Sequence, residues 1–499
     1  MFLSVRLPAF VTGVFIMAAL EPQSSAAAEM DLNEVVKKTQ ISGFLSIRGG
    51  QIREEDVTYL ITLDDSWSFS DESLIGLQMD TQVSDKLSTS IQFTSKTRGE
   101  SVNLEWAFLE YAFQPDLKVR AGRLRAPGFM LSEFLDVGYA YPWAQVPDEV
   151  YGWLPSSRYE GLDLRYWTSY GAADLRVNPF LGTTTNQKIS LGNVDYADQE
   201  SRFYGIEVQM NYDIYSARIG FSKYKFELSE STWDRFISSA VDGVTVVPDM
   251  GPFGEGVEVP GFVDYVEDIM VNGVLAELIA WPELADFVPV FQAEQTSLLN
   301  QLPPYQSIPL MNGRFGAKFY GIGFSADDGT YLLMTEACHS AIGGLYPDVE
   351  SGYIMAGYRF GNLMPHVTVS RMYTVDDDER PHLSPLDVNE LIWNSDPQLQ
   401  QVVAGAAAYT DLLIASAQLL QLDATTYTVS VRWDPVASLA LKAEIFRADL
   451  KNGSYGFVLP ESIVALATQS STSTSLESIS IPEAPDSVDG MRVSIDVVF

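Results

Sequence analysis

The sequence is short of several residue types, and each shortage narrows the classes of protein to which the chain can belong. One of its 499 residues is a cysteine, Cys338, so the chain cannot form an intrachain disulfide. Basic residues are scarce, with 31 Lys and Arg against 66 Asp and Glu, for a net charge of −35. Because nucleic-acid binding needs a concentrated basic face that displaces counterions, we expect no nucleic-acid partner.

Long apolar runs are missing after the start of the chain. Arg6 precedes an apolar run from Leu7 to Leu20, and three alanines at 26–28 offer small residues for cleavage before Glu29. The run of about 14 residues is shorter than the roughly 20 that a spanning helix needs. We therefore interpret residues 1–28 as a removed export signal. Any later membrane crossing would have to be made by strands.

Catalytic motifs are also missing. Only His339, His366 and His382 could serve as imidazole bases, and the sequence has no GxSxG elbow, HExxH helix or Walker loop. An acidic run at 376–379 fits a solvated loop better than a cation site, because no segment has EF-hand spacing. We expect no enzyme, no cofactor and no metal site.

A two-residue alternation of apolar and polar residues is what the sequence does contain. In the final stretch GMRVSIDVVF, apolar Met491, Val493, Ile495, Val497 and Phe499 occupy every second position. This period is typical of a strand that is wet on one face. The pattern recurs in about sixteen segments, near 41–52, 74–83, 87–96, 104–113, 117–124, 159–169, 172–182, 203–212, 215–226, 315–325, 330–338, 350–361, 364–375, 424–433, 438–449 and 489–499.

The connections between these segments alternate between short turns and long loops. Such alternation is typical of a transmembrane antiparallel up-and-down β-barrel with tight turns on the periplasmic side and long loops outside. A soluble barrel would instead bury its apolar face inward. We expect an all-β chain: a short periplasmic segment at 29–40, then a barrel over 41–499 with long extracellular loops at about 227–314, 376–423 and 450–488.

Two further features refine this picture. Helical periodicity from Ser231 to about Leu302 and from about Leu386 to Leu422 predicts helices that pack over the barrel mouth. Aromatic residues near strand ends fit the girdles of a membrane barrel; they include Tyr159, Tyr212, Tyr224 and Phe499.

Alternation also places charged side chains inside the barrel, since a charge facing lipid costs about 2 to 4 kcal/mol at the midplane. The basic residues sent inward include Arg48, Lys118, Arg120, Arg165, Arg176, Arg218 and Arg432. Opposed basic and acidic walls would set up a transverse field that favours polar solutes. Alternatively, each arginine forms a salt bridge that holds the wall and selects nothing.

With its exported start, its strand pattern, its terminal Phe499 and the segment LKVRAGRLRAPGF at 117–129, the chain resembles the Gram-negative outer-membrane porins. The resemblance implies an integral outer-membrane location, contact with outer-membrane lipid and lipopolysaccharide, a homotrimer, and recognition of the last strand by the barrel assembly machinery. It also implies that the third long loop, about 125–158, folds into the lumen and presents Glu133, Asp136, Asp148 and Glu149 to the basic wall.

One residue is placed differently by the two arguments. Alternation turns Lys118 and Arg120 inward, whereas the resemblance points Arg123 at the pore. A bulge or the strand's end would reconcile them.

The function expected from these patterns is passive diffusion of small hydrophilic solutes and ions through a water-filled channel with a charged constriction. Two alternatives remain open. One is a substrate-selective anion channel, and the other is a surface barrel whose loops serve adhesion or phage attachment.

Overall fold

The computed structural model describes residues 37–60, 62–69, 72–97, 102–152, 158–184, 188–191, 194–197, 201–228, 244–246, 257–259, 262–307, 313–342, 347–375, 382–418, 421–460 and 484–499. The expected export signal at 1–28 and most of the segment at 29–40 lie outside this part. Among the described residues, no helix combines the length and apolar character needed to cross a membrane.

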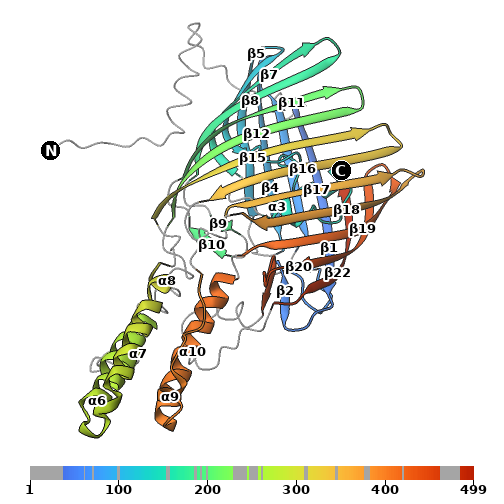
Figure 1. Ribbon diagram of the computed structural model, residues 1–499. Helices are drawn as coiled ribbons and strands as arrows, with labels where there is room; N and C mark the ends of the chain where they lie inside the picture. Colours follow the sequence, from blue (N-terminus) through green and yellow to red (C-terminus); the bar gives the residue numbers. More distant parts are fainter. Residues whose placement is uncertain are drawn as a thin grey trace, which may run out of the picture.

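Sixteen antiparallel strands form a closed barrel, as the alternation predicted (Figure 1). Every one of the segments expected from the sequence is a barrel strand, and the all-β barrel prediction is confirmed. The strands are β1 (Thr39–Ile52), β3 (Leu74–Gln82), β4 (Leu87–Lys96), β5 (Val102–Gln114), β6 (Leu117–Arg125), β7 (Arg158–Tyr170), β8 (Ala173–Thr184), β11 (Ser201–Tyr212), β12 (Tyr215–Leu228), β15 (Gly313–Asp327), β16 (Tyr331–Ile342), β17 (Val349–Tyr358), β18 (Leu363–Thr374), β19 (Asp423–Val436), β20 (Leu439–Leu450) and β22 (Ser487–Val498).

The barrel closes where its two ends meet. Strand β22 pairs with β1 over Phe44 to Ile52, and the Phe499 and Gly43 backbones exchange two hydrogen bonds of 2.7 and 2.9 Å. The terminal strand is therefore paired on both sides, with β20 and with β1. This leaves no open strand edge at the seam.

Short turns join the strands at one end of the barrel. Several contain a residue in the left-handed region, including Gly171 (φ 62°), Asp213 (φ 52°) and Gly329 (φ 84°). Positive φ values match the twist of tight hairpins and are accessible to Gly and Asp at low cost. The expected segments leave gaps at 170–171, 213–214 and 326–329, where these turns lie.

The two faces of the wall have the reverse of a soluble protein's polarity. On β18, Val367 and Val369 face outward and are 52% and 40% exposed, whereas His366, Thr368 and Ser370 face inward and are each 3% exposed. An apolar surface of this extent requires an apolar surrounding. The strands are thus built to stand in hydrocarbon with their polar side chains inside.

The aromatic residues divide between the two faces. Tyr212 and Phe499 are exposed on the outside, as a girdle requires. Tyr159 and Tyr224 are instead buried inside the barrel, in a ring cluster with Phe180 and Phe203. The expectation that they lie at the membrane surface is therefore wrong, because both occupy inward positions of their strands.

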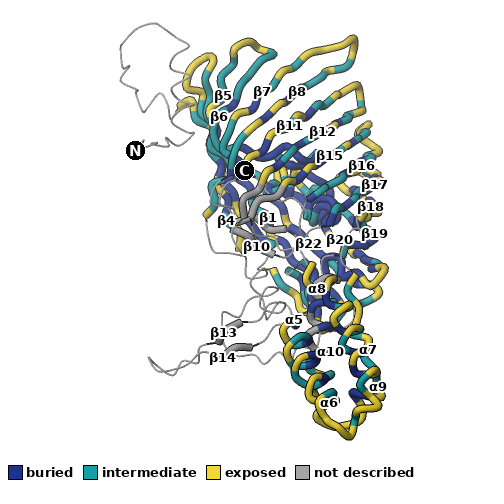
Figure 2. Tube along the Cα trace, turned by 60° about the vertical axis from the view of Figure 1, so that its left-hand side comes forward, coloured by how far each residue is buried: buried dark blue, intermediate teal, exposed yellow. Residues whose placement is uncertain are grey.

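The fifth and seventh long loops form a helical module (residues 262–306 and 390–418) with a hydrophobic core of its own. Figures 1 and 2 show these helices projecting from one end of the barrel, side by side. The expectation that they pack over the mouth is wrong, because their apolar faces pack on one another. The elements are α5 (Phe262–Asp264), the π-helix η3 (Tyr265–Leu275), α6 (Ala276–Ala280), η4 (Pro282–Phe287), α7 (Val288–Gln301), α8 (Pro303–Gln306), α9 (Glu390–Trp393) and α10 (Pro397–Gln418).

Three small sheets complete the described loops. The first and eighth loops meet through β2 (Val57–Tyr59) and β21 (Val458–Pro460). Hairpins form from β9 (Lys188–Leu191) with β10 (Val194–Ala197), and from β13 (Val244–Val246) with β14 (Val257–Val259).

Replacing Trp393 with Ala should loosen the helical module and leave the barrel intact. Trp393 is 0% exposed and donates from its indole N–H to Glu294 at 2.7 Å, so it joins the two loops. The loss of packing should cost about 3 to 5 kcal/mol. We expect faster chymotrypsin cleavage within 262–306 and 390–418, with unchanged heat-modifiable mobility of the barrel on SDS gels. Trp281→Ala, at a residue 56% exposed, is the control. Equal cleavage of both variants would contradict a separate core.

Candidate functional site: the inward-folded third loop

The third long loop leaves β6 at Arg125 and runs across the barrel interior. Its early residues reach the opposite wall, where the Met130 N–H donates to the Glu336 carboxylate on β16 at 2.7 Å. The Tyr151 hydroxyl donates to the same carboxylate on the way back. At its far point the Tyr139 hydroxyl donates to the carbonyl of Ala437, in the short turn between β19 and β20, at 2.5 Å. The loop thus reaches the end of the barrel that carries the short turns.

An apolar cluster fixes much of this loop. Leu131, Trp143 and Val150 are buried against inward side chains of the wall such as Phe319 and Tyr353. The interior is therefore not lined by polar side chains throughout, as strand alternation alone would suggest. Phe319 and Tyr353 occupy positions of their strands that face the lumen. Their burial therefore depends on the loop, which covers them.

Lys442 of β20 binds the loop at two backbone positions. Its ammonium group donates to the carbonyls of Gly138 at 2.6 Å and Trp143 at 2.9 Å, and it lies 2.9 Å from the Asp496 carboxylate. The side chains of Lys442 and Asp496 are 1% and 0% exposed. Carbonyl and carboxylate acceptors together offset the cost of burying this cation.

The returning part of the loop includes a short helix, α3 (Asp148–Tyr151), whose acids face the wall. Arg492 of β22 lies 2.9 Å from Asp148, and the Glu149 carboxylate accepts from the Thr426 hydroxyl. Burial raises the pKa of Asp148 to about 6, although Arg492 opposes the rise, and Glu149 adds to it. Asp148 is therefore ionised and paired at neutral pH and loses its charge on mild acidification.

The other two loop acids pair with the wall beside the loop. Glu133 contacts Arg120 at 3.3 Å and also Arg165, while Arg120 pairs with Asp163 of β7. Burial raises the pKa of Glu133, but the neighbouring arginines, led by Arg165, lower it by more, and the net pKa lies below its usual range. Glu133 is thus held as a carboxylate.

Asp136 contacts Arg125 and lies 3.2 Å from Lys96. Arg125 also pairs with Glu105 at 3.1 Å, and Glu105 accepts from Arg158 at 3.3 Å. The four acids expected in the loop therefore all meet polar or basic groups of the wall.

Of the basic residues expected on the lumen wall, seven lie inside the barrel, and each has a described polar partner. Arg48 donates to Gln145 at 3.2 Å and also to Tyr141. The remaining partners are Glu110 for Lys118 (2.7 Å), Asp163 and Glu133 for Arg120, Glu133 for Arg165, Glu207 for Arg176 (2.7 Å) and Arg218 (3.5 Å), and Asp434 for Arg432 (2.9 Å).

Arg123 lies on the outward face of β6 instead, 2.6 Å from Glu160 of β7. The register explains this placement. Arg120 is opposite Asp163 and Leu124 is opposite the buried Tyr159, so Arg123 falls on the other face. The alternation holds from Arg120 to Leu124, so Arg123 stays outward, and it is lost only at Arg125, which is buried beside Glu105 and Asp136.

Sequence reasoning left several residues out of the candidate site. Lys442, Asp496 and Arg492 have inward parity, which was the available signal, but nothing in the sequence shows that the loop reaches them. Glu336 likewise has inward parity on β16. Arg125 lies one residue beyond the expected strand at 117–124, so alternation did not assign it to either face of the barrel.

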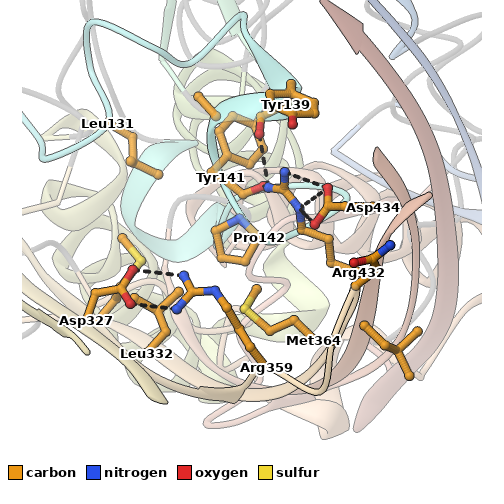
Figure 3. A pocket seen from close by; sticks show the side chains of 15 residues that line it. Leu131, Tyr139, Tyr141, Pro142, Asp327, Leu332, Arg359, Met364, Arg432 and Asp434 are labelled. Carbon is orange, nitrogen blue, oxygen red and sulfur yellow. Dashed lines mark hydrogen bonds and ion pairs between the residues drawn. The ribbon is translucent and has the colours of Figure 1, made fainter. Parts of the chain in front are cut away.

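Described residues line two cavities beside the loop. One, of about 510 Å³, is lined by polar residues of β3 to β7, including Gln78, Asp80 and Ser90, and by Arg120 and Glu133. The other, of about 440 Å³, lies by the short-turn end. Figure 3 shows two ion pairs among the residues that line this cavity, Arg432 with Asp434 and Arg359 with Asp327. Both cavities present charged pairs to solvent, so a polar solute beside the loop would meet groups of both signs.

Comparison with known proteins finds likeness only among solved structures. No protein-family model and no curated protein matches the sequence. Similar structures include OmpT, an outer membrane protein of Vibrio cholerae (9% identity, 92% of this chain and 97% of that chain, TM-score 0.45). Others are the anion-selective porin from Comamonas acidovorans (12%, 92% and 99%, TM-score 0.45) and the outer membrane channel DcaP of Acinetobacter baumannii (10%, 92% and 97%, TM-score 0.43). Because these TM-scores lie below 0.5, nothing about the function of this chain is inferred from them.

Replacing Lys442 with Met should destabilise the barrel with its loop. The change leaves Asp496 and two loop carbonyls without their cation. Breaking a buried pair in this way costs about 3 to 5 kcal/mol. Urea unfolding followed by tryptophan fluorescence measures the loss. The matched control is Arg447→Met on the same strand, whose side chain is 54% exposed and pairs with Asp449, and it should change stability by at most about 1 kcal/mol. Similar losses in the two variants would contradict the role of Lys442.

Acidification through about pH 6 should tighten the returning part of the loop, because buried Asp148 takes up a proton at a pKa of about 6, whereas an exposed aspartate does so only at about 4. Hydrogen–deuterium exchange, corrected for intrinsic rates, should show stronger protection of amides 144–152 below this pH. Asp148→Asn, which has no charge to lose, should show no such increase. A pH response of the same size in that variant would refute the assignment to Asp148.

Proposed function

We propose that the chain is a channel of the Gram-negative outer membrane, through which small hydrophilic solutes and ions diffuse passively past a charged constriction. One observation carries the proposal: a loop held to the wall by the buried Asp148–Arg492 ion pair and by hydrogen bonds from Lys442 to loop carbonyls crosses a barrel whose exterior is apolar and whose interior is charged. An apolar exterior suits a membrane. A fixed loop beside polar cavities suits a filter, because its charges stay in place while solutes pass.

We place the proposed filter around Glu133. Four guanidinium groups, those of Arg120, Arg165, Arg176 and Arg218, act on this carboxylate. Asp163 and Glu207 are the other acids paired with these arginines. Among these seven groups the four arginines outnumber the three acids, although Asp80 and Glu110 also line the cavity.

A substrate-selective anion channel is the second candidate, and one observation favours it. The Nε atoms of Arg165, Arg176 and Arg218 are buried and, among the described residues, donate to no acceptor. Unused guanidinium donors are suited to an anion with several oxygen atoms, such as phosphate or a carboxylate. A homotrimer and recognition by the barrel assembly machinery stay predictions from the resemblance to porins.

Reversal potential in a planar bilayer under a salt gradient tests the proposal with purified full-length protein. We expect ohmic conductance for the native chain. Glu133→Gln should shift the reversal potential towards anions, since it removes a negative charge from the cavity, and Arg165→Gln should shift it towards cations. Arg447→Gln, on the outer face, is the control and should shift nothing.

The outcomes separate the candidates. Strong block by one anion, relieved in Arg165→Gln, would support the selective channel. Equal shifts in the lumen variants and in Arg447→Gln would rule out the proposed filter. No conductance from correctly folded barrels would overturn the channel itself and leave a role of the extracellular loops.

A further inference from the structure

The helical module carries charge of one sign only. It contains seven Asp and Glu in residues 262–306 and three in residues 390–418, and no Lys or Arg in either segment. Acids inside the barrel have cationic partners, as Asp163 has Arg120. Among the described residues, no carboxylate of the module forms an ion pair. The module therefore presents negative charge to solvent that the chain does not neutralise.

The corner between α6 and α7 is the end of the module farthest from the barrel. Figures 1 and 2 place α6 at this end, and Figure 2 shows the chain there as largely exposed. Trp281, with an extended backbone (φ −83°, ψ 120°), begins the corner, and the 3-10 helix η4 follows it. Because the module belongs to long loops, this corner points away from the membrane. We call residues 281–290 the module tip.

Large apolar side chains are exposed at the module tip. Trp281 is 56% exposed, Phe287 55% and Val290 39%, and none of them belongs to the core of the module. The Phe287 ring lies 6.5 Å from that of the buried Phe291, which helps to hold it in place. Single exposed apolar residues need no explanation, but three within ten residues, away from the membrane, fit a binding surface.

The acids of the module tip lie beside these apolar side chains. Residues three apart lie on the same edge of a 3-10 helix. Glu283 and Asp286 therefore share one edge of η4, and Leu284 and Phe287 share the next. Both acids are exposed. The tip thus presents an acidic edge next to an apolar edge.

We propose that the module tip binds a basic polypeptide that presents apolar side chains among its lysines and arginines. Charge complementarity selects this partner, because nucleic acid, anionic headgroups and a second acidic module would all be repelled. The indole of Trp281 can also stack on a lysine or arginine. A metal ion fits less well, since the described residues include no group of three His, Cys, Asp or Glu that could hold one. The proposal goes beyond the proposed channel and does not rest on it.

Fluorescence anisotropy of a labelled peptide tests the surface, with the full chain in phosphatidylcholine nanodiscs and empty discs as the blank. The probe is a short synthetic peptide of lysine and leucine, and a glutamate–leucine peptide is the comparison. We expect saturable binding of the lysine peptide alone. Trp281→Ala should weaken it on the order of ten-fold, as truncation of an interface hot spot does. Leu299→Ala, at a residue 41% exposed on α7 outside the tip, is the matched control and should change binding less than two-fold.

A second pair of variants tests the acids without touching the apolar side chains. Glu283→Gln/Asp286→Asn should weaken binding of the lysine peptide on the order of five-fold at low salt and much less at high salt, because salt screens exposed charges. Glu55→Gln/Asp65→Asn removes two exposed charges from the first loop and is the matched control. It should change binding less than two-fold.

Native affinity for the lysine peptide in Trp281→Ala would overturn the proposal. Equal losses in the two double variants would do so too, because the peptide would then respond to overall charge. If Trp281→Ala dissociates oligomers in analytical ultracentrifugation and leaves peptide binding unchanged, the tip is an interface between copies of the chain and the proposal is wrong. Chymotrypsin cleavage at the native rate establishes that the module of each variant is folded. None of these readouts depends on conductance, so failure of the proposed channel and failure of the binding surface are distinguishable.

Discussion

The pairing of backbone polar groups is the constraint on which the rest of the structure depends. Within hydrocarbon an unpaired N–H or C=O costs several kcal/mol, so strands can cross only if the sheet has no edge. The chain meets this condition by pairing β22 with β1 and by exchanging hydrogen bonds between Phe499 and Gly43. Closure in turn fixes which side chains face lipid. A single register thereby sets the apolar exterior and the charged interior.

The interior then has to accommodate many charges in a small space, and the third loop makes this possible. Its carboxylates and carbonyls serve as partners for cations of the wall: Asp148 for Arg492, Glu133 for Arg165, and the Gly138 carbonyl for Lys442. Buried cations are tolerated only with such partners, because desolvation otherwise exceeds the gain. Loop and wall are therefore interdependent, and the charged residues that hold the loop are also those that a passing solute would meet.

The sequence predicts the barrel well because strand alternation and turn residues are local signals. For β5 the expected strand was 104–113, and the structure has Val102–Gln114. Alternation along β6 alone correctly predicted that Arg120 faces the lumen. The resemblance predicted that the loop folds into the lumen, but the sequence did not show where it meets β20, since Lys442 binds there to the carbonyls of Gly138 and Trp143, which have no sequence signature. The burial of Phe319 and Tyr353 depends on that path too. Helical periodicity likewise located the helices near α7 and α10 but did not show that Trp393 and Leu413 would pack in a core apart from the barrel.

The claim that the two faces of one wall meet different solvents is the centre of this account. It is tested most directly by labelling single cysteines with a water-soluble thiol reagent in a Cys338→Ser background, in lipid vesicles. Cysteines at Gln78, Asp80 and Ser90, which line the larger lumen cavity, should react, and those at the outward positions Leu77, Met79 and Ile91 should stay protected. Equal labelling at both sets, or the reverse alternation, would contradict a membrane barrel with an aqueous interior.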